Sequence, residues 1–289
     1  MSNADIRVSS TCFSAYGTTS AYCQDDNGHG THVAGIAAAM NNTTGVVGVA
    51  PGATVYSVRV LHKGSGADSA VIAGLDWVLA NENKVTPRIR VANMSLGRLA
   101  SSDDSAMQAA VAAVNAAGIT VVVAAGNDAA LEANAQVPAK FAEAIAVGST
   151  TAEAGTPGKG ACNGAIAADT ASLFTSDGTA VAISAPGETK EDLKGCTITA
   201  DGILSLARGG GTVKMYGTSM AAPHVAGAIA LMWDRADDKG GSLSPAQVRT
   251  AITATASRKG TAPLNSPTGG YSFDGVREGI LNVPAALAY

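Results

Sequence analysis

The stretch of the sequence best suited to covalent chemistry places a serine where a helix is expected to begin. It reads Gly217-Thr218-Ser219-Met220-Ala221-Ala222-Pro223, and small or apolar residues continue a helical pattern to about Trp233. Unpaired backbone N–H groups and the helix dipole favour negative charge at a helix N-terminus. Ser219 is therefore predicted to be a nucleophile that attacks a carbonyl carbon. The alternative is a buried helix of small residues that happens to start with a serine.

Two further polar side chains can complete this chemistry. His29 lies between glycines in Asn27-Gly28-His29-Gly30-Thr31, where an imidazole can take the serine proton and return it to a leaving amine. Asn127 follows the apolar run 119–125, and its amide can donate a hydrogen bond to a developing oxyanion. A turn that closes the strand is the alternative for Asn127.

The remaining histidines are expected to be structural or surface residues: His32, His62 and His224. His32 follows His29 at a spacing that shares a helix face. The sequence has no His-Glu-x-x-His pattern and no evident third ligand, so a metal pair is not supported.

The blocks around His29, Asn127 and Ser219, in this order, resemble the subtilisin-like serine proteases (subtilases) over most of the chain, from about residue 5 to residue 283. The resemblance implies a serine endopeptidase that hydrolyses peptide bonds by acyl transfer. In that mechanism Ser219 is the nucleophile, His29 the general base and Asn127 the oxyanion donor. It also implies that a polypeptide substrate adds as a strand along segments that correspond to Gly64, Ser65, Gly66, Ser95, Leu96 and Gly97. By the same resemblance, Gly126 and Asn127 form a wall of the primary specificity pocket.

A loop from Met40 to Val46 matches a calcium loop found in many subtilases. The resemblance implies a structural calcium ion bound by the Asp5 carboxylate, the Asn42 side chain and the carbonyls of Met40, Thr44 and Val46. An all-oxygen ligand set suits calcium. From the residues alone, the segment is a polar loop.

The resemblance stops at the aspartate that orients the histidine in subtilases. That aspartate ends a central strand in an apolar-Asp-Thr/Ser-Gly context, which this sequence lacks. Asp5-Ile6-Arg7-Val8 matches the segment just after that strand, so the expected aspartate would lie before Met1. Losing its function lowers kcat by roughly 10⁴. Asp25 and Asp26 are poorly placed to replace it, because they belong to the same loop as His29.

Two explanations for the missing aspartate stay open. Residues 1–289 can be one subtilase-like peptidase domain that is N-terminally incomplete, with a missing N-terminal segment or a propeptide as its partner. Alternatively, the chain is a catalytically impaired pseudoprotease or a peptide-binding scaffold of the same fold. The opening Met1-Ser2-Asn3-Ala4 is expected to be a cloning remnant.

Alternating strands and helices must position these groups. The patterns predict strands at 55–60, 89–94, 119–125 and 144–148, and helices at 29–40, 67–83, 102–117, 218–233 and 244–256. This alternation predicts an α/β fold with three αβα layers and a mostly parallel central sheet. Sites in such sheets form beyond the carboxyl ends of the strands. Long connections are expected at 150–180 and 186–202, strand pieces within 203–216, and short strands at 271–283.

The composition excludes several functional classes. Of the 289 residues, 15% are charged and the net charge is −4, with Lys and Arg scattered, so no nucleic-acid surface is expected. No run approaches the roughly 18 apolar residues that span a membrane, and no signal peptide is present. We therefore expect no membrane or nucleic-acid partner. The subtilase resemblance and the even number of cysteines lead us to expect a secreted protein, and we expect a monomer.

The four cysteines contain no Cys-x-x-Cys pair, which argues against zinc and redox motifs and fits two disulfides in an exported protein. Sequence order favours the pairs Cys12–Cys23 and Cys162–Cys196. Two other pairings are compatible with four cysteines, and four buried free thiols are a further alternative.

Overall fold

A four-stranded parallel sheet forms the centre of the computed structural model, which describes residues 5–159, 163–267 and 274–289. Its strand order is β3–β5–β7–β8, and every neighbouring pair is parallel. The strands are β3 (Val91–Met94), β5 (Thr120–Ala124), β7 (Ala144–Thr151) and β8 (Val181–Glu188). All residues of β5 and β7 are buried, as expected for strands that are covered on both faces.

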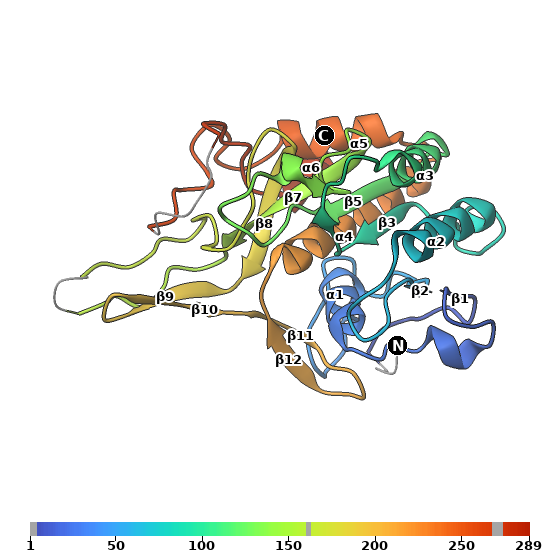
Figure 1. Ribbon diagram of the computed structural model, residues 1–289, viewed down its shortest axis with the longest axis horizontal. Coiled ribbons are helices and arrows are strands. Elements are labelled where there is room, and N and C mark those ends of the chain that lie inside the picture. Colours follow the sequence, from blue (N-terminus) through green and yellow to red (C-terminus); the bar gives the residue numbers. More distant parts are fainter. Residues whose placement is uncertain (1–4, 160–162, 268–273) are drawn as a thin grey trace.

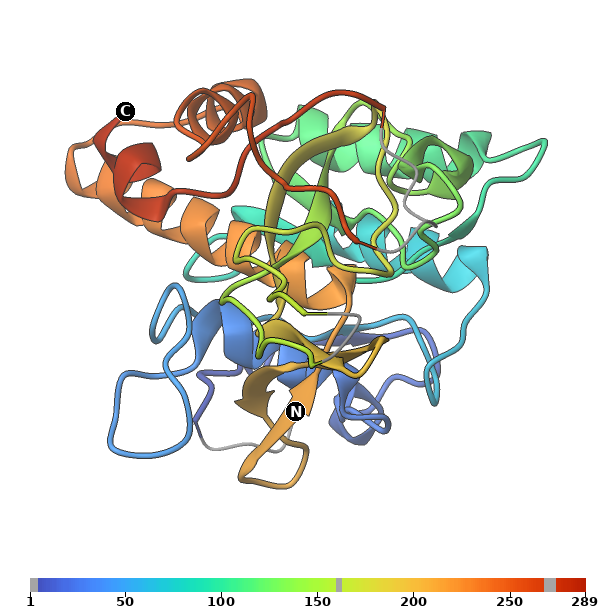
Figure 2. The ribbon, with the colours of Figure 1, turned by 90° about the vertical axis from the view of Figure 1, so that its left-hand side faces the viewer.

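Helices cover both faces of this sheet (Figures 1 and 2). One core joins α2 (Asp68–Asn81) and α3 (Ser105–Ala116) to Val121 and Val123. The other joins Val122 to a layer that contains α4 (Thr218–Asp238), α5 (Pro245–Ala254) and α6 (Val283–Ala288). Successive β5 residues thus point to opposite cores. The predicted three-layer α/β architecture is confirmed.

His29 lies on α1 (His29–Ala38), which packs against α4. In Figure 2, α1 (blue) lies on the side of α4 (orange) that is opposite α5 and α6. Ser244 caps α5 through a capping box with Gln247, and Pro245 occupies its first turn, two features that favour a helix start. No helix in the described ranges is both long enough and apolar enough to cross a membrane.

Four two-stranded sheets surround the central sheet. Their pairs are β1 (Phe13–Ser14) with β2 (Val58–Arg59), β4 (Arg98–Leu99) with β6 (Gln136–Val137), β9 (Lys190–Lys194) with β10 (Thr197–Asp201), and β11 (Ile203–Leu206) with β12 (Thr212–Met215). The two short 3-10 helices are η1 (Ser20–Cys23) and η2 (Ala133–Ala135). The β9–β10 pair forms an arm that projects from the body (Figure 1).

Two sequence predictions about irregular segments are wrong. Residues 186–202, expected to be a connection, contain the end of β8 and the β9–β10 pair; cross-strand backbone pairing stabilises this arm despite its polar sequence. The expected short strands at 271–283 are not seen in residues 274–282, where Ile280 makes only isolated bridges. The Asn282 side chain instead accepts a hydrogen bond from Ala285 N–H and caps α6. The expected strand at 55–60 is shorter, spanning Val58–Arg59.

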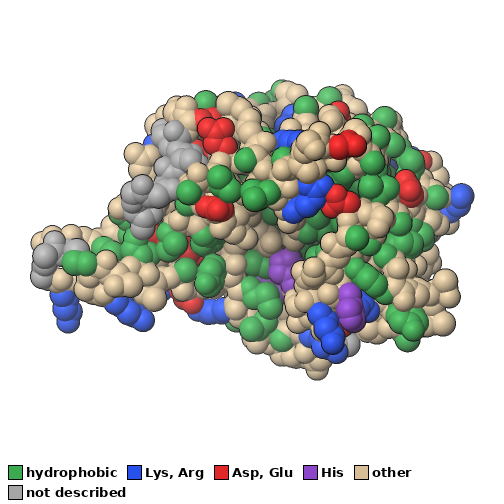
Figure 3. Space-filling model, viewed as in Figure 1, with side chains coloured by type: hydrophobic (Ala, Val, Ile, Leu, Met, Phe, Trp, Pro, Cys, Tyr) green, Lys and Arg blue, Asp and Glu red, His purple; other side chains and the backbone are tan. Residues whose placement is uncertain are grey.

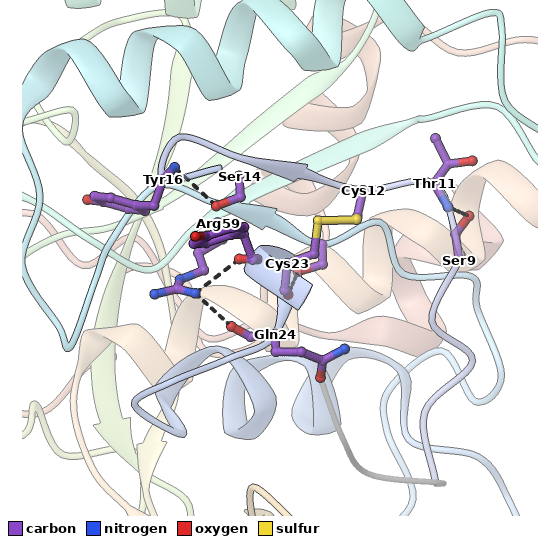
Figure 4. Close-up of a disulfide and its surroundings, with 10 residues drawn as sticks. Ser9, Thr11, Cys12, Ser14, Tyr16, Cys23, Gln24 and Arg59 are labelled. Atoms are coloured by element: carbon purple, nitrogen blue, oxygen red, sulfur yellow. Dashed lines mark hydrogen bonds between the residues drawn. A yellow bond between two sulfur atoms is a disulfide. The ribbon is translucent and has the colours of Figure 1, made fainter. Parts of the chain in front are cut away.

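One predicted disulfide is present and holds the N-terminal region together. Cys12 and Cys23 are bonded across 11 residues of sequence. Beside them, the Arg59 guanidinium donates to the carbonyls of Tyr22 and Gln24 (Figure 4). The disulfide thus joins η1 to the β1–β2 pair. The second predicted pair, Cys162–Cys196, includes Cys162, which lies outside the described residues.

Removing the Cys12–Cys23 crosslink is expected to lower the free energy of unfolding by about 3 kcal/mol, the chain-entropy value for so short a loop. Chemical denaturation of the double variant Cys12→Ser/Cys23→Ser measures this. The single variant Cys12→Ser is the control and should lose as much, because the crosslink is absent in both. An unchanged denaturation midpoint would contradict the prediction.

Candidate active site

Ser219 is the second residue of α4, at the helix N-terminus that the sequence predicts. The preceding Gly217 has φ 146°, a value that favours glycine, and its N–H donates to Gly187 O at 3.0 Å. This turn presents the Ser219 side chain, which is half-buried, beyond the carboxyl ends of the strands. The Ser219 hydroxyl donates to Ser95 O at 3.4 Å.

Asn127 is tied to the same helix turn. Its Oδ1 accepts hydrogen bonds from Thr218 N–H at 2.8 Å and from the Thr218 hydroxyl at 2.9 Å. These bonds fix the amide so that Nδ2 lies on the other side, where a Cβ placed on Gly217 would be 3.3 Å away. The exposed amide therefore keeps its N–H donors for a ligand next to Ser219, as an oxyanion donor requires.

The ends of β3 and β5 meet α4 through a small polar network. The Ser95 hydroxyl donates to Ser219 O at 2.7 Å and accepts from Asn93 Nδ2 at 3.0 Å. Gly126 N–H donates to the Thr218 hydroxyl at 3.2 Å. The predicted segments around Ser95 and Gly126 thus lie at the nucleophile. Gly97 approaches Val137 closely, since a Cβ on Gly97 would be 3.0 Å from Val137 O.

The other predicted substrate segment, Gly64-Ser65-Gly66, forms a tight turn in which Ser65 pairs with His62. Gly64 has φ 89°, and a Cβ on it would be 3.2 Å from Asn27 Nδ2. The turn therefore lies beside the loop that precedes His29. This brings the predicted groove segment and the predicted base into one region.

His29 begins α1, which packs on α4, the helix that carries Ser219. Val33, one turn further along α1, belongs to the same small core as Met220, the neighbour of Ser219. Burial lowers the pKa of His29 below its ordinary value of 6.5, against the opposing charge of Asp25. The imidazole is therefore neutral at neutral pH, as a general base must be. Among the described residues, the structure shows no hydrogen bond to the His29 ring.

The Asp25 carboxylate accepts several hydrogen bonds at the start of α1. It accepts from the backbone N–H groups of Asn27, Gly28 and Thr31 and from the Thr31 hydroxyl, at 2.6–2.9 Å. Burial acts to raise the pKa of Asp25, and the hydrogen bonds together outweigh it, so the pKa lies below the ordinary value of 3.8. Asp25 therefore acts on His29 through its charge rather than through a hydrogen bond.

The Asp26 carboxylate forms ion pairs with Arg59 and His62. It contacts Arg59 and His62, both at 2.5 Å, and accepts from Lys63 N–H at 3.0 Å. It therefore joins the His29 loop to the Gly64 turn. It does not contact the His29 ring.

The other histidines are packed as expected. His32 is fully buried, and its Nε2 lies 3.0 Å from Ile203 O and 3.1 Å from Val213 O. Nδ1 of His224 lies 2.8 Å from Met220 O. Burial lowers the pKa of both imidazoles. No group of three or more His, Cys, Asp or Glu side chains with metal-binding geometry occurs in the described part of the chain.

The predicted calcium loop brings several oxygen atoms to one point. Asp5 Oδ1 accepts from Thr44 Oγ1 at 2.9 Å and from Asn42 Nδ2 at 3.1 Å. Asn42 Oδ1 accepts from Thr44 N–H at 2.9 Å and Thr44 Oγ1 at 3.0 Å. Met40 N–H donates to Asp5 O at 2.9 Å. The Asp5 carboxylate, the Asn42 side chain and the Thr44 hydroxyl thus lie together, and oxygen atoms of this kind are the ligands that a hard cation prefers. The Asn42 amide nitrogen, and not its oxygen, faces Asp5.

Sequence reasoning missed the roles of Thr218 and Asp25. Thr218 orients Asn127 with two donors, and Asp25 caps α1. The sequence signals were slight: a threonine beside the serine, and an acidic residue shortly before a predicted helix, which is a common capping arrangement.

An α/β fold that presents a serine at a helix N-terminus, beside the carboxamide of Asn127, is typical of the class of serine-nucleophile hydrolases. A family model described as the subtilase family matches residues 2–270. The chain therefore belongs to the subtilase family, and this membership supports serine protease activity.

Relatives of known sequence and structure agree with that assignment. Subtilisin DY from Bacillus licheniformis is 36% identical over 242 residues, which cover 83% of this chain and 74% of the relative. Alkaline elastase YaB from Bacillus sp. (strain YaB) is 38% identical over 237 residues, covering 82% and 52%. The crystal structure of a cold adapted subtilisin-like serine proteinase aligns with a TM-score of 0.67 at 30% identity, covering 96% of this chain and 80% of that one.

Replacing Asp25 by alanine is expected to lower the free energy of unfolding at pH 7 by about 2 kcal/mol, because donors at the start of α1 lose their acceptor. The folded pKa of Asp25 lies below its unfolded value. The contribution is therefore present above about pH 4 and is lost as the pH falls through the folded pKa.

Urea unfolding of Asp25→Ala between pH 2 and pH 8 checks both the size and the sign. Asp76→Ala removes an exposed carboxylate of α2 and should leave stability within about 0.5 kcal/mol. A wild-type advantage that grows below pH 4 would contradict the assignment of Asp25.

Proposed function

We propose that the protein is a serine endopeptidase that cleaves polypeptides by acyl transfer at Ser219. The observation that carries this proposal is the placement of Ser219 at the N-terminus of α4 beside an amide that Thr218 orients. The subtilase family match supports the same chemistry.

The mechanism assigns one role to each group. His29 accepts the Ser219 proton as Oγ attacks the scissile carbonyl, and returns that proton to the leaving amine. The Asn127 amide and the Ser219 N–H hold the oxyanion. Water, activated by the same imidazole, then hydrolyses the acyl-enzyme. The substrate backbone lies along Gly64–Gly66 and Ser95–Gly97, with Gly126 at the wall of the specificity pocket.

The carboxylate that should orient His29 is the missing part of this mechanism. Among the described residues, neither Asp25 nor Asp26 contacts the imidazole, because each is held by other donors. This observation favours the second candidate function, a pseudoprotease or peptide-binding scaffold that keeps the cleft without turnover. The two candidates differ in whether Ser219 reacts.

A fluorophosphonate probe separates the two functions. Under the proposal, the probe labels the chain and Ser219→Ala abolishes the label, whereas Ser69→Ala, which removes an exposed hydroxyl of α2, keeps it. Without an orienting carboxylate, the rate is expected to be about 10⁴ below that of a complete triad. Peptide binding without any Ser219-dependent label would favour the scaffold and reject the protease.

Asn127 provides a second test of the mechanism. Asn127→Asp keeps an acceptor for Thr218 but removes the N–H donors, so the rate of Ser219 labelling should fall about 10²–10³-fold. The scale of this loss is the one known for removal of the oxyanion asparagine of a subtilisin. Asn134→Asp, at an exposed amide that bonds Thr179, is the control. Equal loss in both variants would argue against an oxyanion role.

We also propose a structural calcium ion in the Met40–Val46 loop. Support comes from the convergence of Asp5 and Thr44 oxygens at 2.9 Å, with Asn42 and the carbonyls of Met40, Thr44 and Val46 as further donors. When bound, the ion would neutralise Asp5 and fix the loop beyond α1. It would take no part in the reaction at Ser219.

Calcium binding is expected to raise the unfolding free energy by about 2.7 kcal/mol at 100 times its dissociation constant. Thermal unfolding with calcium and with chelator measures the effect. Asp5→Asn should remove the calcium response, and Asp76→Asn should retain it. A chelator effect that survives in Asp5→Asn would place the ion elsewhere.

Two further features fit an extracellular protease. The Cys12–Cys23 disulfide is typical of oxidising compartments. Positive and negative side chains are interspersed over the face shown in Figure 3, which offers no extended basic surface to a nucleic acid. We therefore propose a secreted enzyme that acts on polypeptides as a monomer.

A further inference from the structure

Two fully buried glutamates lie where the central sheet continues into the projecting arm; we call them the Glu188–Glu191 pair. Glu188 ends β8 and Glu191 belongs to β9 (Figure 1), and both residues are 0% exposed. We propose that their two carboxyl groups share one proton and form an alkaline switch behind the turn that presents Ser219. At alkaline pH, hydroxide removes the shared proton, which leaves two carboxylates in contact and one molecule of water.

The oxygen atoms of the pair meet too few donors for two charges. Neither carboxyl oxygen of Glu188 accepts a hydrogen bond from residues 5–159, 163–267 or 274–289, and the same holds for Glu191 Oε2. Glu191 Oε1 accepts from Leu173 N–H at 2.6 Å. The two carboxyl groups lie within hydrogen-bonding reach of each other. A bond between them needs a proton on one of them, because a carboxylate accepts but cannot donate.

Burial makes two negative charges at this position costly. It raises the pKa of Glu188 to about 8, and the charge of Glu191 acts in the same direction. Burial also raises the pKa of Glu191. The Ser172 hydroxyl opposes the pKa shift of Glu188 only in part, as the Leu173 N–H does for Glu191. The pair therefore keeps a proton at neutral pH, as two neighbouring carboxyl groups that cannot both ionise do.

The surrounding side chains supply no compensating cation. In the described part of the chain, no lysine, arginine or histidine is among the groups that shift the pKa of either glutamate. Lys190 lies between the two glutamates in sequence, but its ammonium group pairs with Asp192 at 3.2 Å. Lys190 Nζ also lies 3.5 Å from the hydroxyl of Thr156. A shared proton is thus the charge balance that these residues provide.

The backbone on either side holds the two glutamates in place. Thr189 N–H donates to Asp201 O at 2.7 Å, which joins the start of the arm to its end. Ala152 N–H donates to Glu188 O at 3.1 Å, which joins the end of β8 to the segment after β7. Relief of a repulsion between two carboxylates therefore requires the base of the arm to open.

Glu188 is joined through the backbone to the turn before Ser219. The preceding residue, Gly187, accepts through its carbonyl from Gly217 N–H at 3.0 Å. The two glycines also touch, since a Cβ on Gly187 would lie 2.6 Å from Gly217 O. A displacement of the end of β8 would therefore act directly on the residue that precedes α4.

Glu191 is joined to the same turn through an aromatic contact. Its carboxyl group holds Leu173 N–H, and the next residue, Phe174, packs against Tyr216 with ring centres 5.5 Å apart. Tyr216 directly precedes Gly217. Repulsion within the pair would thus disturb the turn from two sides. The effect on Ser219 rests on the proposed function, whereas the shared proton does not.

Glu188→Gln tests the shared proton, because an amide can donate to Glu191 at every pH. The folded pKa of Glu188 lies above its ordinary value of 4.5, so between pH 4.5 and about pH 8 the folded state holds a proton that the unfolded state has lost. Wild-type stability should therefore fall as the pH rises through this window. Relative to Glu188→Gln, the wild-type unfolding constant should rise by up to about tenfold per pH unit, as urea unfolding measures.

Two further variants make this test specific. Glu153→Gln changes an exposed glutamate on the segment after β7 and should follow the wild-type profile. Glu191→Gln keeps an amide oxygen for Leu173 N–H and should show the same relative gain as Glu188→Gln. A wild-type profile that matches both glutamine variants of the pair overturns the proposal. Loss of folding in both variants also overturns it, because a pair that shares a proton tolerates either amide.

A cation in place of the proton is the competing explanation, and calcium is the probe. Asp5→Asn should remove the loop site proposed above, so the measurement uses this background at pH 9. Calcium should then shift Tm equally with and without Glu188→Gln. A calcium-dependent rise in Tm that Glu188→Gln abolishes overturns the shared proton.

Serine labelling tests the connection to the active site. Between pH 8 and pH 10, fluorophosphonate labelling of Ser219 should fall at least tenfold in the wild type relative to Glu188→Gln, and should recover on return to pH 7. Glu153→Gln should match the wild type. Equal alkaline profiles in the wild type and Glu188→Gln overturn the switch. No label at any pH, with the expected unfolding profiles, rejects the proposed function and supports the shared proton.

Hydrogen exchange measures the opening without any need for activity. The ratio of wild-type to Glu188→Gln exchange rates at the Leu173 amide should rise at least tenfold between pH 7 and pH 9, because the comparison at each pH cancels the chemical rate. Return to pH 7 should restore the ratio. A ratio that does not change with pH overturns the switch.

Discussion

Two hydrogen bonds from Thr218 to Asn127 Oδ1, at 2.8 and 2.9 Å, are the constraint on which the site depends. They join the end of β5 to the first turn of α4 across 91 residues of sequence. Because α4 packs along all four strands of the central sheet and its Met220 shares a small core with α1, its N-terminus cannot shift without disturbing this packing. Ser219 and Asn127 therefore share one rigid frame.

His29, the proposed general base, begins a helix that packs on α4 and β11. α1 contacts α4 through small and medium apolar side chains such as Val33, and Asp25 satisfies the donors at its start. That arrangement commits the Asp25 carboxylate to the start of α1 and leaves the half-buried imidazole with a lowered pKa and without an acceptor among the described residues. Asp25 accepts hydrogen bonds at the start of α1 and so does not also orient the imidazole of His29. Orientation of that imidazole by a carboxylate would require a second acidic residue.

The sequence by itself determined the three-layer fold, the helix start at Ser219 and the strand before Asn127, because small-residue helices and fully apolar strands leave local patterns that few other structures share. Polar segments carried no such pattern, so the β9–β10 arm and the cap of α6 were missed. Only the tertiary structure decided that Thr218 would orient Asn127 and that Asp25 would accept hydrogen bonds from the start of α1. Which donor meets which acceptor depends on how distant elements pack, and neither composition nor spacing encodes that directly.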